Sequence, residues 1–284
     1  MSELDVRTLA VGGRTLRVGT SPSRPGSVPL LFFNGIGANL DLVRGFADEI
    51  GRFGIGIVIF DVPGTGGSSP PPVPYRLRSL AALAANVLAA VGIDGQVDVG
   101  GVSWGGGLAQ EFAHQYPKRV RRLVLAATTA GSVAIPGRLS ALAKLLSPRR
   151  YAEPAFMARI AGDLYGGKFR NNPDLIAKYA VQLRAPHGSG YYFQLLAGLG
   201  WTSALWLRRL RQPALVMVGA DDPIVPAANG RILAGLLPNA RLVTIDDGHL
   251  FLVTSAPESA AIVAEFLTSD EPARTHAAPA AANR

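Results

Sequence analysis

One serine in this chain stands in a setting that could make its hydroxyl a nucleophile. Gly101-Val102-Ser103-Trp104-Gly105 fits the pattern G-x-S-x-G. An apolar run (97–102) precedes the serine and a helix-forming run (108–113) follows it, which predicts a strand, a tight turn and a helix. Such a turn strains the backbone at the serine and tolerates little more than a hydrogen at the flanking positions. It also brings the N–H groups of the helix start beside the reacting oxygen.

A nucleophilic serine needs a general base, and the chain has four histidines. His276 lies near the end of the chain, and His187 lies in a loop next to a proline. His114 falls on the predicted helix three turns beyond Ser103, at its wrong end. His249 follows the last predicted strand and a glycine, downstream of two aspartates. It is the one histidine that completes the order serine, aspartate, histidine, so we predict it as the base.

The acid that would orient this base is one of two neighbours, Asp221 and Asp222. Both follow the apolar run Ala214-Leu215-Val216-Met217-Val218. A carboxylate just beyond a late strand is where such an acid belongs. The residue types alone leave both aspartates open.

The elements that must position these residues alternate between buried strands and helices. A hairpin is expected over 6–18. Continuous apolar runs predict strands at 28–33, 56–60, 97–102, 123–127, 214–218 and 241–245, and helices are expected at 40–50, 79–91 and 257–267. Strands without polar alternation are typical of a parallel sheet that is covered on both faces. We therefore predict an α/β fold with a mostly parallel central sheet flanked by helices.

The pattern changes after residue 131. Residues 132–206 contain no buried strand pattern, only helical patches interrupted by prolines, and we predict them to be an inserted helical cap. The core is expected at 1–131 and 207–268, followed by a disordered tail at 269–284. Most of the large apolar residues of the cap should pack within it, and the rest should line an apolar substrate groove: Phe156, Met157, Tyr165, Phe169, Tyr191, Tyr192, Phe193 and Trp201.

Composition excludes several classes of protein. The 284 residues contain no cysteine, which excludes disulfides and thiol nucleophiles and is consistent with a cytoplasmic protein. No apolar run is long enough to span a membrane, and the N-terminal residues do not form a secretory signal. The net charge is +8, with basic clusters at 118–122, 149–150 and 208–211. Without a nucleic-acid-binding motif, we expect solvated basic clusters and no nucleic-acid partner.

The chain resembles the α/β-hydrolases, in which G-x-S-x-G forms the nucleophile elbow. Within that superfamily it is similar to the intracellular medium-chain-length polyhydroxyalkanoate depolymerases over roughly residues 28–268. The segments that carry this likeness are 34–39 (NGIGAN), 60–64 (FDVPG), 101–106 (GVSWGG), 197–203 (AGLGWTS) and 246–251 (DDGHLF). The cap segment discriminates best, because the elbow is shared with the whole superfamily.

The resemblance implies roles for individual residues. The family pattern G-x-x-D-x-x-x-P matches from Gly219 to Pro226 and places the acid at Asp222. The loop after the strand 28–33 is where α/β-hydrolases carry one arm of the oxyanion hole, and many have His-Gly where this chain has Asn34-Gly35. The backbone N–H groups of Ile36 and Trp104 are therefore expected to hold the oxyanion.

The resemblance also implies the reaction. It indicates a serine hydrolase that cleaves intracellular poly(3-hydroxyalkanoate) with medium-length side chains through a 3-hydroxyacyl-serine intermediate, without a metal or organic cofactor. The expected partner is the aliphatic polyester, with the protein at the surface of a storage granule that the basic clusters could help attract. Two alternatives stay open: an esterase, lipase or acyltransferase acting on soluble esters, and a protein that binds granules without catalysis. Side-chain preference, endo or exo attack and oligomeric state do not follow from the residues.

Overall fold

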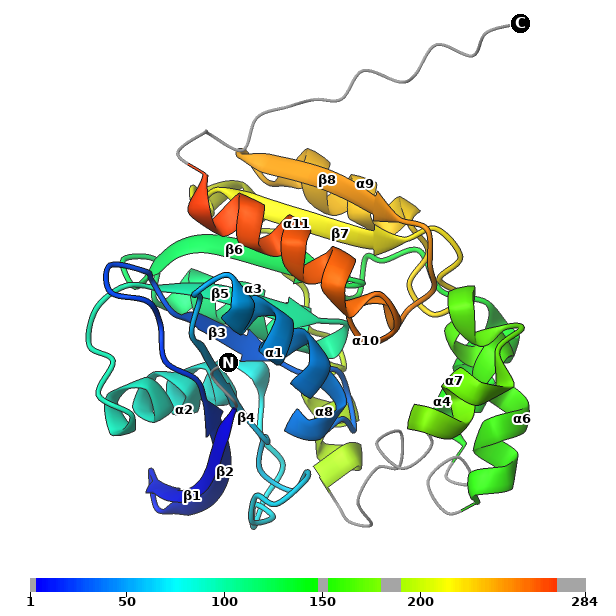
Figure 1. Cartoon of the computed structure of the whole chain (residues 1–284), viewed down its shortest axis with the longest axis horizontal. Helices are drawn as coiled ribbons and strands as arrows, with labels where there is room; N and C mark the ends of the chain where they lie inside the picture. Colours follow the sequence, from blue (N-terminus) through cyan, green and yellow to red (C-terminus); the bar gives the residue numbers. More distant parts are fainter. Residues whose placement is uncertain (1–3, 148–152, 180–189, 270–284) are drawn as a thin grey trace, which may run out of the picture.

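The computed structural model describes residues 4–147, 153–179 and 190–269. Its centre is one eight-stranded sheet in the order β1-β2-β4-β3-β5-β6-β7-β8 (Figure 1). The strands are β1 (Asp5–Val11), β2 (Arg14–Thr20), β3 (Leu30–Phe33), β4 (Ile57–Phe60), β5 (Val97–Val102), β6 (Val120–Ala126), β7 (Ala214–Gly219) and β8 (Ala240–Ile245). From β4 to β8 all neighbouring strands run parallel, which confirms the predicted fold class.

The antiparallel part of the sheet is the predicted hairpin. Gly12 and Gly13 connect β1 to β2 with φ angles of 56° and 74°. A two-residue turn with two positive φ angles matches the twist of the flanking strands, and glycine adopts it without strain. β2 then pairs antiparallel with β4 and so joins the hairpin to the parallel sheet.

The continuous apolar strands are explained by a core on each face of the sheet. In β3, Leu31 and Phe33 belong to one apolar cluster, and Leu30 and Phe32 belong to the other. Successive side chains of a strand point to opposite faces, so a strand buried on both sides must be apolar throughout. The helices of the core are α1 (Arg44–Arg52), α2 (Leu77–Ala90), α3 (Trp104–Gln115), α9 (Ala228–Leu236), α10 (Phe251–Thr254) and α11 (Ala256–Thr268), with short 3₁₀ turns η1 (Leu40–Val43) and η3 (Leu207–Arg209).

Helices occupy the described part of the chain between β6 and β7. They are α4 (Leu139–Leu146), α6 (Pro154–Tyr165), η2 (Gly167–Phe169), α7 (Pro173–Tyr179) and α8 (Gly190–Gly198). In Figure 1, α4, α6 and α7 gather beyond the carboxyl ends of the parallel strands. A third apolar cluster, which includes Met157, Leu164 and Phe169, holds this group together. The domain limits at 131/132, 206/207 and 268/269 stay predictions.

Several predicted features lie outside the described residues. These are the tail beyond Ser269, the arginine pair 149–150, and the histidines at 187 and 276. Within the described ranges, every helix is too short or too polar to cross a lipid bilayer.

Candidate active site

Ser103 lies at the junction of β5 and α3 with φ 56° and ψ −121°. A positive φ is rare for a residue with a side chain and marks local strain. The two glycines of the motif are required by close backbone contacts. A Cβ atom on Gly101 would lie 2.2 Å from the carbonyl oxygen of Gly105, and one on Gly105 would lie 2.2 Å from that of Phe33. The tight elbow therefore depends on glycine at both positions.

His249 and Asp222 are joined directly. His249 Nδ1 lies 2.7 Å from Asp222 Oδ2, and both residues are buried. The other carboxylate oxygen, Oδ1, accepts the N–H groups of Ile224 and Val225 at 2.9 and 2.8 Å. The backbone N–H of His249 donates to the carbonyl of Tyr165 at 2.7 Å. These contacts fix both the carboxylate and the imidazole in one orientation.

Asp221, the alternative acid, is turned toward the cap. Its carboxylate accepts a hydrogen bond from Arg170 Nη2 at 2.8 Å and one from the backbone N–H of Gly167 at 2.9 Å. The Arg170 guanidinium holds the pKa of Asp221 below its usual value. Of the two neighbouring aspartates, Asp222, which the family pattern indicated, is the one that contacts His249.

Ser103 and His249 meet at one cavity. Asn34, Gly35 and Ile36 also line it, and the remaining lining residues are mainly apolar: Ala38, Leu42, Val43, Val102, Leu145, Tyr165, Ile224, Leu250, Leu252 and Val253. Among the described residues, the Ser103 hydroxyl makes no hydrogen bond to His249. Hydrogen bonds between a nucleophile and its base are often long in the absence of substrate and tighten when it binds.

A second, more open cavity lies on the other side of Ser103. Its lining includes Trp104, Thr128, Thr129, Ser132, Leu199 and Trp201. Ser103 lines both cavities. Of the large cap residues that the sequence singled out, Tyr165 and Trp201 line these cavities, whereas Met157 and Phe169 pack in the cap interior.

The two predicted oxyanion donors belong to residues that line different cavities beside Ser103. Ile36 lines the first cavity, and Trp104 is the first residue of α3 and lines the second. The loop that carries Ile36 abuts the nucleophile, because a Cβ on Gly35 would lie 3.6 Å from Ser103 Cβ.

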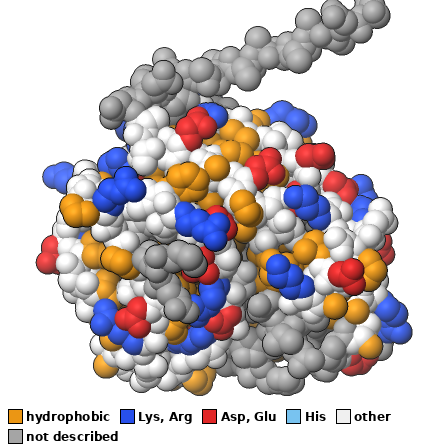
Figure 2. Space-filling model, in the orientation of Figure 1, with side chains coloured by type: hydrophobic (Ala, Val, Ile, Leu, Met, Phe, Trp, Pro, Cys, Tyr) orange, Lys and Arg blue, Asp and Glu red, His pale blue; other side chains and the backbone are white. Residues whose placement is uncertain are grey.

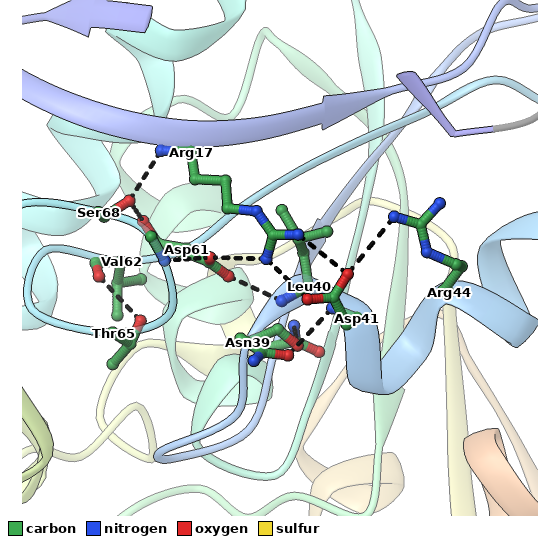
Figure 3. A network of polar contacts seen from close by, with 11 residues as sticks. Arg17, Asn39, Leu40, Asp41, Arg44, Asp61, Val62, Thr65 and Ser68 are labelled. Atoms are coloured by element: carbon green, nitrogen blue, oxygen red, sulfur yellow. Dashed lines mark hydrogen bonds and ion pairs between the residues drawn. The ribbon is translucent and has the colours of Figure 1, made fainter. Parts of the chain in front are cut away.

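A buried aspartate outside the predicted triad, Asp61, holds the end of this loop in place (Figure 3). Asp61 accepts the N–H groups of Leu40 at 2.7 Å and Gly67 at 3.0 Å, and Arg17 lies 3.5 Å away. Burial raises the pKa of Asp61, and the two backbone N–H groups and Arg17 oppose the rise. Arg17 also binds Asp41 at 2.8 Å and so connects β2 to the start of η1.

Asp247 is a second supporting residue, which sequence reasoning missed. It is 3% exposed and accepts the backbone N–H of Lys168 at 2.9 Å and the hydroxyls of Thr254 and Ser255, both at 2.6 Å. Burial raises its pKa, but these hydrogen bonds outweigh that effect and hold the pKa below its usual value. Asp247 thereby joins the histidine loop to the cap at Lys168. Its place two residues before His249 was the available signal.

Comparison with known proteins agrees with this geometry. The model of the alpha/beta hydrolase fold family matches residues 28–256. The chain belongs to the α/β-hydrolase family. Among solved structures, the enol-lactonase from Burkholderia xenovorans LB400 has a TM-score of 0.79 and 22% identity, over 93% of this chain and 100% of that one.

The sequence relatives are more specific. A poly(3-hydroxyalkanoate) depolymerase from Ectopseudomonas oleovorans is 50% identical over 264 residues, which is 93% of each chain. The 3-oxoadipate enol-lactonase 2 of Acinetobacter baylyi is 26% identical over 225 residues, covering 78% of this chain and 81% of the relative. The first relative confirms the resemblance that the sequence segments indicated.

Proposed function

We propose that this protein hydrolyses the ester bonds of poly(3-hydroxyalkanoate) with medium-length side chains, with Ser103, His249 and Asp222 as its catalytic triad. The observation that carries the proposal is the hydrogen bond between His249 and Asp222 beside a cavity that Ser103 also lines. The relative from Ectopseudomonas oleovorans supports the choice of substrate, because half of all aligned residues are identical across nearly the full length of both chains.

The reaction follows from the geometry of the triad. His249 takes the proton of the Ser103 hydroxyl while the oxygen attacks the ester carbonyl, and Asp222 stabilises the imidazolium. The N–H groups of Ile36 and Trp104 donate hydrogen bonds to the oxyanion. One such donor typically lowers the activation free energy by about 3 kcal/mol. His249 then protonates the departing alkoxide, which leaves as a hydroxyl chain end. Water activated by His249 hydrolyses the 3-hydroxyacyl-Ser103 ester and releases the acid.

The surface of the cap is suited to an apolar polymer. Large apolar side chains are exposed between β6 and β7: Val133, Ile135, Leu139, Leu146, Tyr192, Leu196, Leu199 and Leu205. Leu199 is 74% exposed and also lines the open cavity beside Ser103. Exposed apolar side chains that are concentrated in one segment of the chain are suited to contact with an apolar partner. We infer that the polyester enters by this side, with the protein associated with storage granules.

The test is incubation of the purified protein with emulsified medium-chain polyester, with released products read by mass spectrometry. We expect release of 3-hydroxy acids or their oligomers, and Ser103→Ala should lower the rate by several orders of magnitude. A protein that turns over p-nitrophenyl octanoate but leaves the polymer intact would instead be an esterase of soluble substrates. Polymer binding that Ser103→Ala leaves unchanged, without any product, would indicate a non-catalytic granule protein.

A further inference from the structure

Gln194 is a polar residue on the inward face of a cap helix. The buried residues of α8 are Gly190, Tyr191, Gln194 and Ala197, while Tyr192 and Leu196 face outward. Gln194 is 1% exposed. Burying an amide is costly unless it is hydrogen-bonded, so a glutamine at a position where leucine would pack needs a partner.

Gln194 contacts both segments that carry the proposed oxyanion donors. Its side-chain oxygen Oε1 accepts the backbone N–H of Gly37 at 2.8 Å, in a buried hydrogen bond. Its backbone oxygen accepts the indole Nε1–H of Trp104 at 2.9 Å. One residue of the cap thus links the loop of Ile36 to the first residue of α3.

The ends of the loop of Ile36 are held by Asn34 Nδ2, which donates to the Asn39 carbonyl at 2.8 Å, and by Asp61 at Leu40, but these contacts do not reach Ile36 and its neighbours. Glycines flank Ile36, and Gly37 has a φ of 71°. A 3.2 Å hydrogen bond from Ala38 N–H to the Gly35 carbonyl closes the turn. Glycine gives such a turn wide conformational freedom. Because Gln194 accepts the N–H of Gly37, it fixes the peptide between Ile36 and Gly37. This restricts how far the preceding Gly35–Ile36 peptide, which carries the Ile36 N–H, can turn.

We propose that Gln194 is a positioning residue that assembles the oxyanion hole when α8 is seated on the core. The cap then has a role beyond covering the substrate, because its docking orients the N–H groups that stabilise the transition state. This inference rests on the proposed serine-hydrolase mechanism, but it does not depend on the polymer being the substrate.

The test compares Gln194→Leu with the unmodified protein on the soluble ester p-nitrophenyl octanoate. Leucine keeps most of the side-chain volume and removes the acceptor. We expect kcat to fall by about 10- to 100-fold with KM changed by less than about twofold, because the lost interaction acts on the transition state. Inhibition by octylboronic acid, which forms a tetrahedral adduct with a serine, should weaken by the same factor as kcat/KM.

Trp104→Phe provides an independent variant, because phenylalanine is also aromatic but lacks the indole N–H that donates to the Gln194 carbonyl. It should also lower kcat, but by a smaller factor than Gln194→Leu. The fold-decrease in kcat of the double variant should be smaller than the product of the two single fold-decreases. Gln194→Met serves in place of Gln194→Leu should that variant not fold.

Gln96→Leu is the matched control. Gln96 is exposed and donates to the Lys118 carbonyl at 3.1 Å, ahead of the amino end of β5. The Gln96→Leu variant should have the same kcat and KM as the unmodified protein. Melting curves should show that both leucine variants are folded. Unchanged kcat in folded Gln194→Leu, or a rise in KM with intact boronate affinity, would overturn the inference. Full turnover of the ester by Ser103→Ala would instead overturn the proposed function, and this inference with it.

Discussion

At the scale of single residues, the two neighbouring aspartates of the site bind different partners. Asp222 holds His249, whereas Asp221 holds the cap through Arg170 and Gly167. Two identical side chains one position apart therefore have different partners at the turn that follows β7. This division gives a sharp test of the proposed triad.

Asp222→Asn should lower kcat/KM for p-nitrophenyl octanoate by about four orders of magnitude, because an amide in its place favours the wrong tautomer of the histidine. Asp221→Asn is the matched control, since the change is the same and the position is adjacent. It should stay within about threefold of the unmodified protein, as expected for a partly exposed ion pair. Equal losses in the two variants would contradict the assignment of the acid.

At the scale of elements, the cap is hydrogen-bonded to the loops that carry the proposed catalytic residues. The segment around η2 contacts the acid loop through Asp221 and the histidine loop through Asp247 and the Tyr165 carbonyl. On the other side of Ser103, α8 contacts the oxyanion loop through Gln194. Stability of the cap and order of the site are therefore coupled.

The ion pair at Asp221 makes this docking dependent on pH. Its pKa is lowered from 3.8 in the folded protein, mainly by Arg170, so its stabilising effect is present above about pH 4 and is lost as the pH falls through the folded pKa. At pH 7 the unmodified protein should have a higher Tm than Asp221→Asn, and the difference should shrink as the pH falls from about 5 to about 3. Melting curves across this range measure it, and a difference that stays constant would exclude the linkage.

At the scale of the whole molecule, the net charge of +8 is not concentrated in a single basic patch on the face that Figure 2 shows. Figure 2 shows Lys and Arg side chains scattered over one face among acidic and apolar ones. Part of the cluster at 118–122 serves the fold. Arg121 binds the buried Asp98, and Arg122 donates to the carbonyl of Phe266 at 2.8 Å, so both tie β6 to other elements. Burial raises the pKa of Asp98, and Arg121 opposes that rise.

Within the predicted basic cluster at 208–211, Arg208 and Arg209 are exposed and could contact a granule surface. The double change Arg208→Glu with Arg209→Glu should weaken binding to granules coated with anionic phospholipid by more than about tenfold at about 10 mM salt. The difference should nearly vanish at about 150 mM salt, where the Debye length is about 8 Å. Turnover of p-nitrophenyl octanoate should not change. Co-sedimentation measures the binding, and equal binding at low salt would rule out electrostatic attraction by this pair.

The sequence by itself determined the framework of this protein. Strands, the hairpin and the elbow were predictable because they depend on local properties: apolar runs, paired glycines at a two-residue turn, and a serine between glycines at a strand end. The position of Ser103, Asp222 and His249 at one edge of the sheet could be expected because each follows a strand, and parallel strands bring their carboxyl ends together. The cap was expected only as a helical insertion, since its short helices are interrupted by prolines.

Only the tertiary structure decided which side chains meet. Residue type alone could not choose between Asp221 and Asp222. The family pattern indicated Asp222, and the structure shows the contact between Asp222 and His249. Gln194 lies 157 positions from Gly37, and no local pattern connects them. Asp61 and Asp247 likewise act through contacts made by distant segments. Such contacts depend on the path of the whole chain, which brings groups together that the sequence keeps far apart.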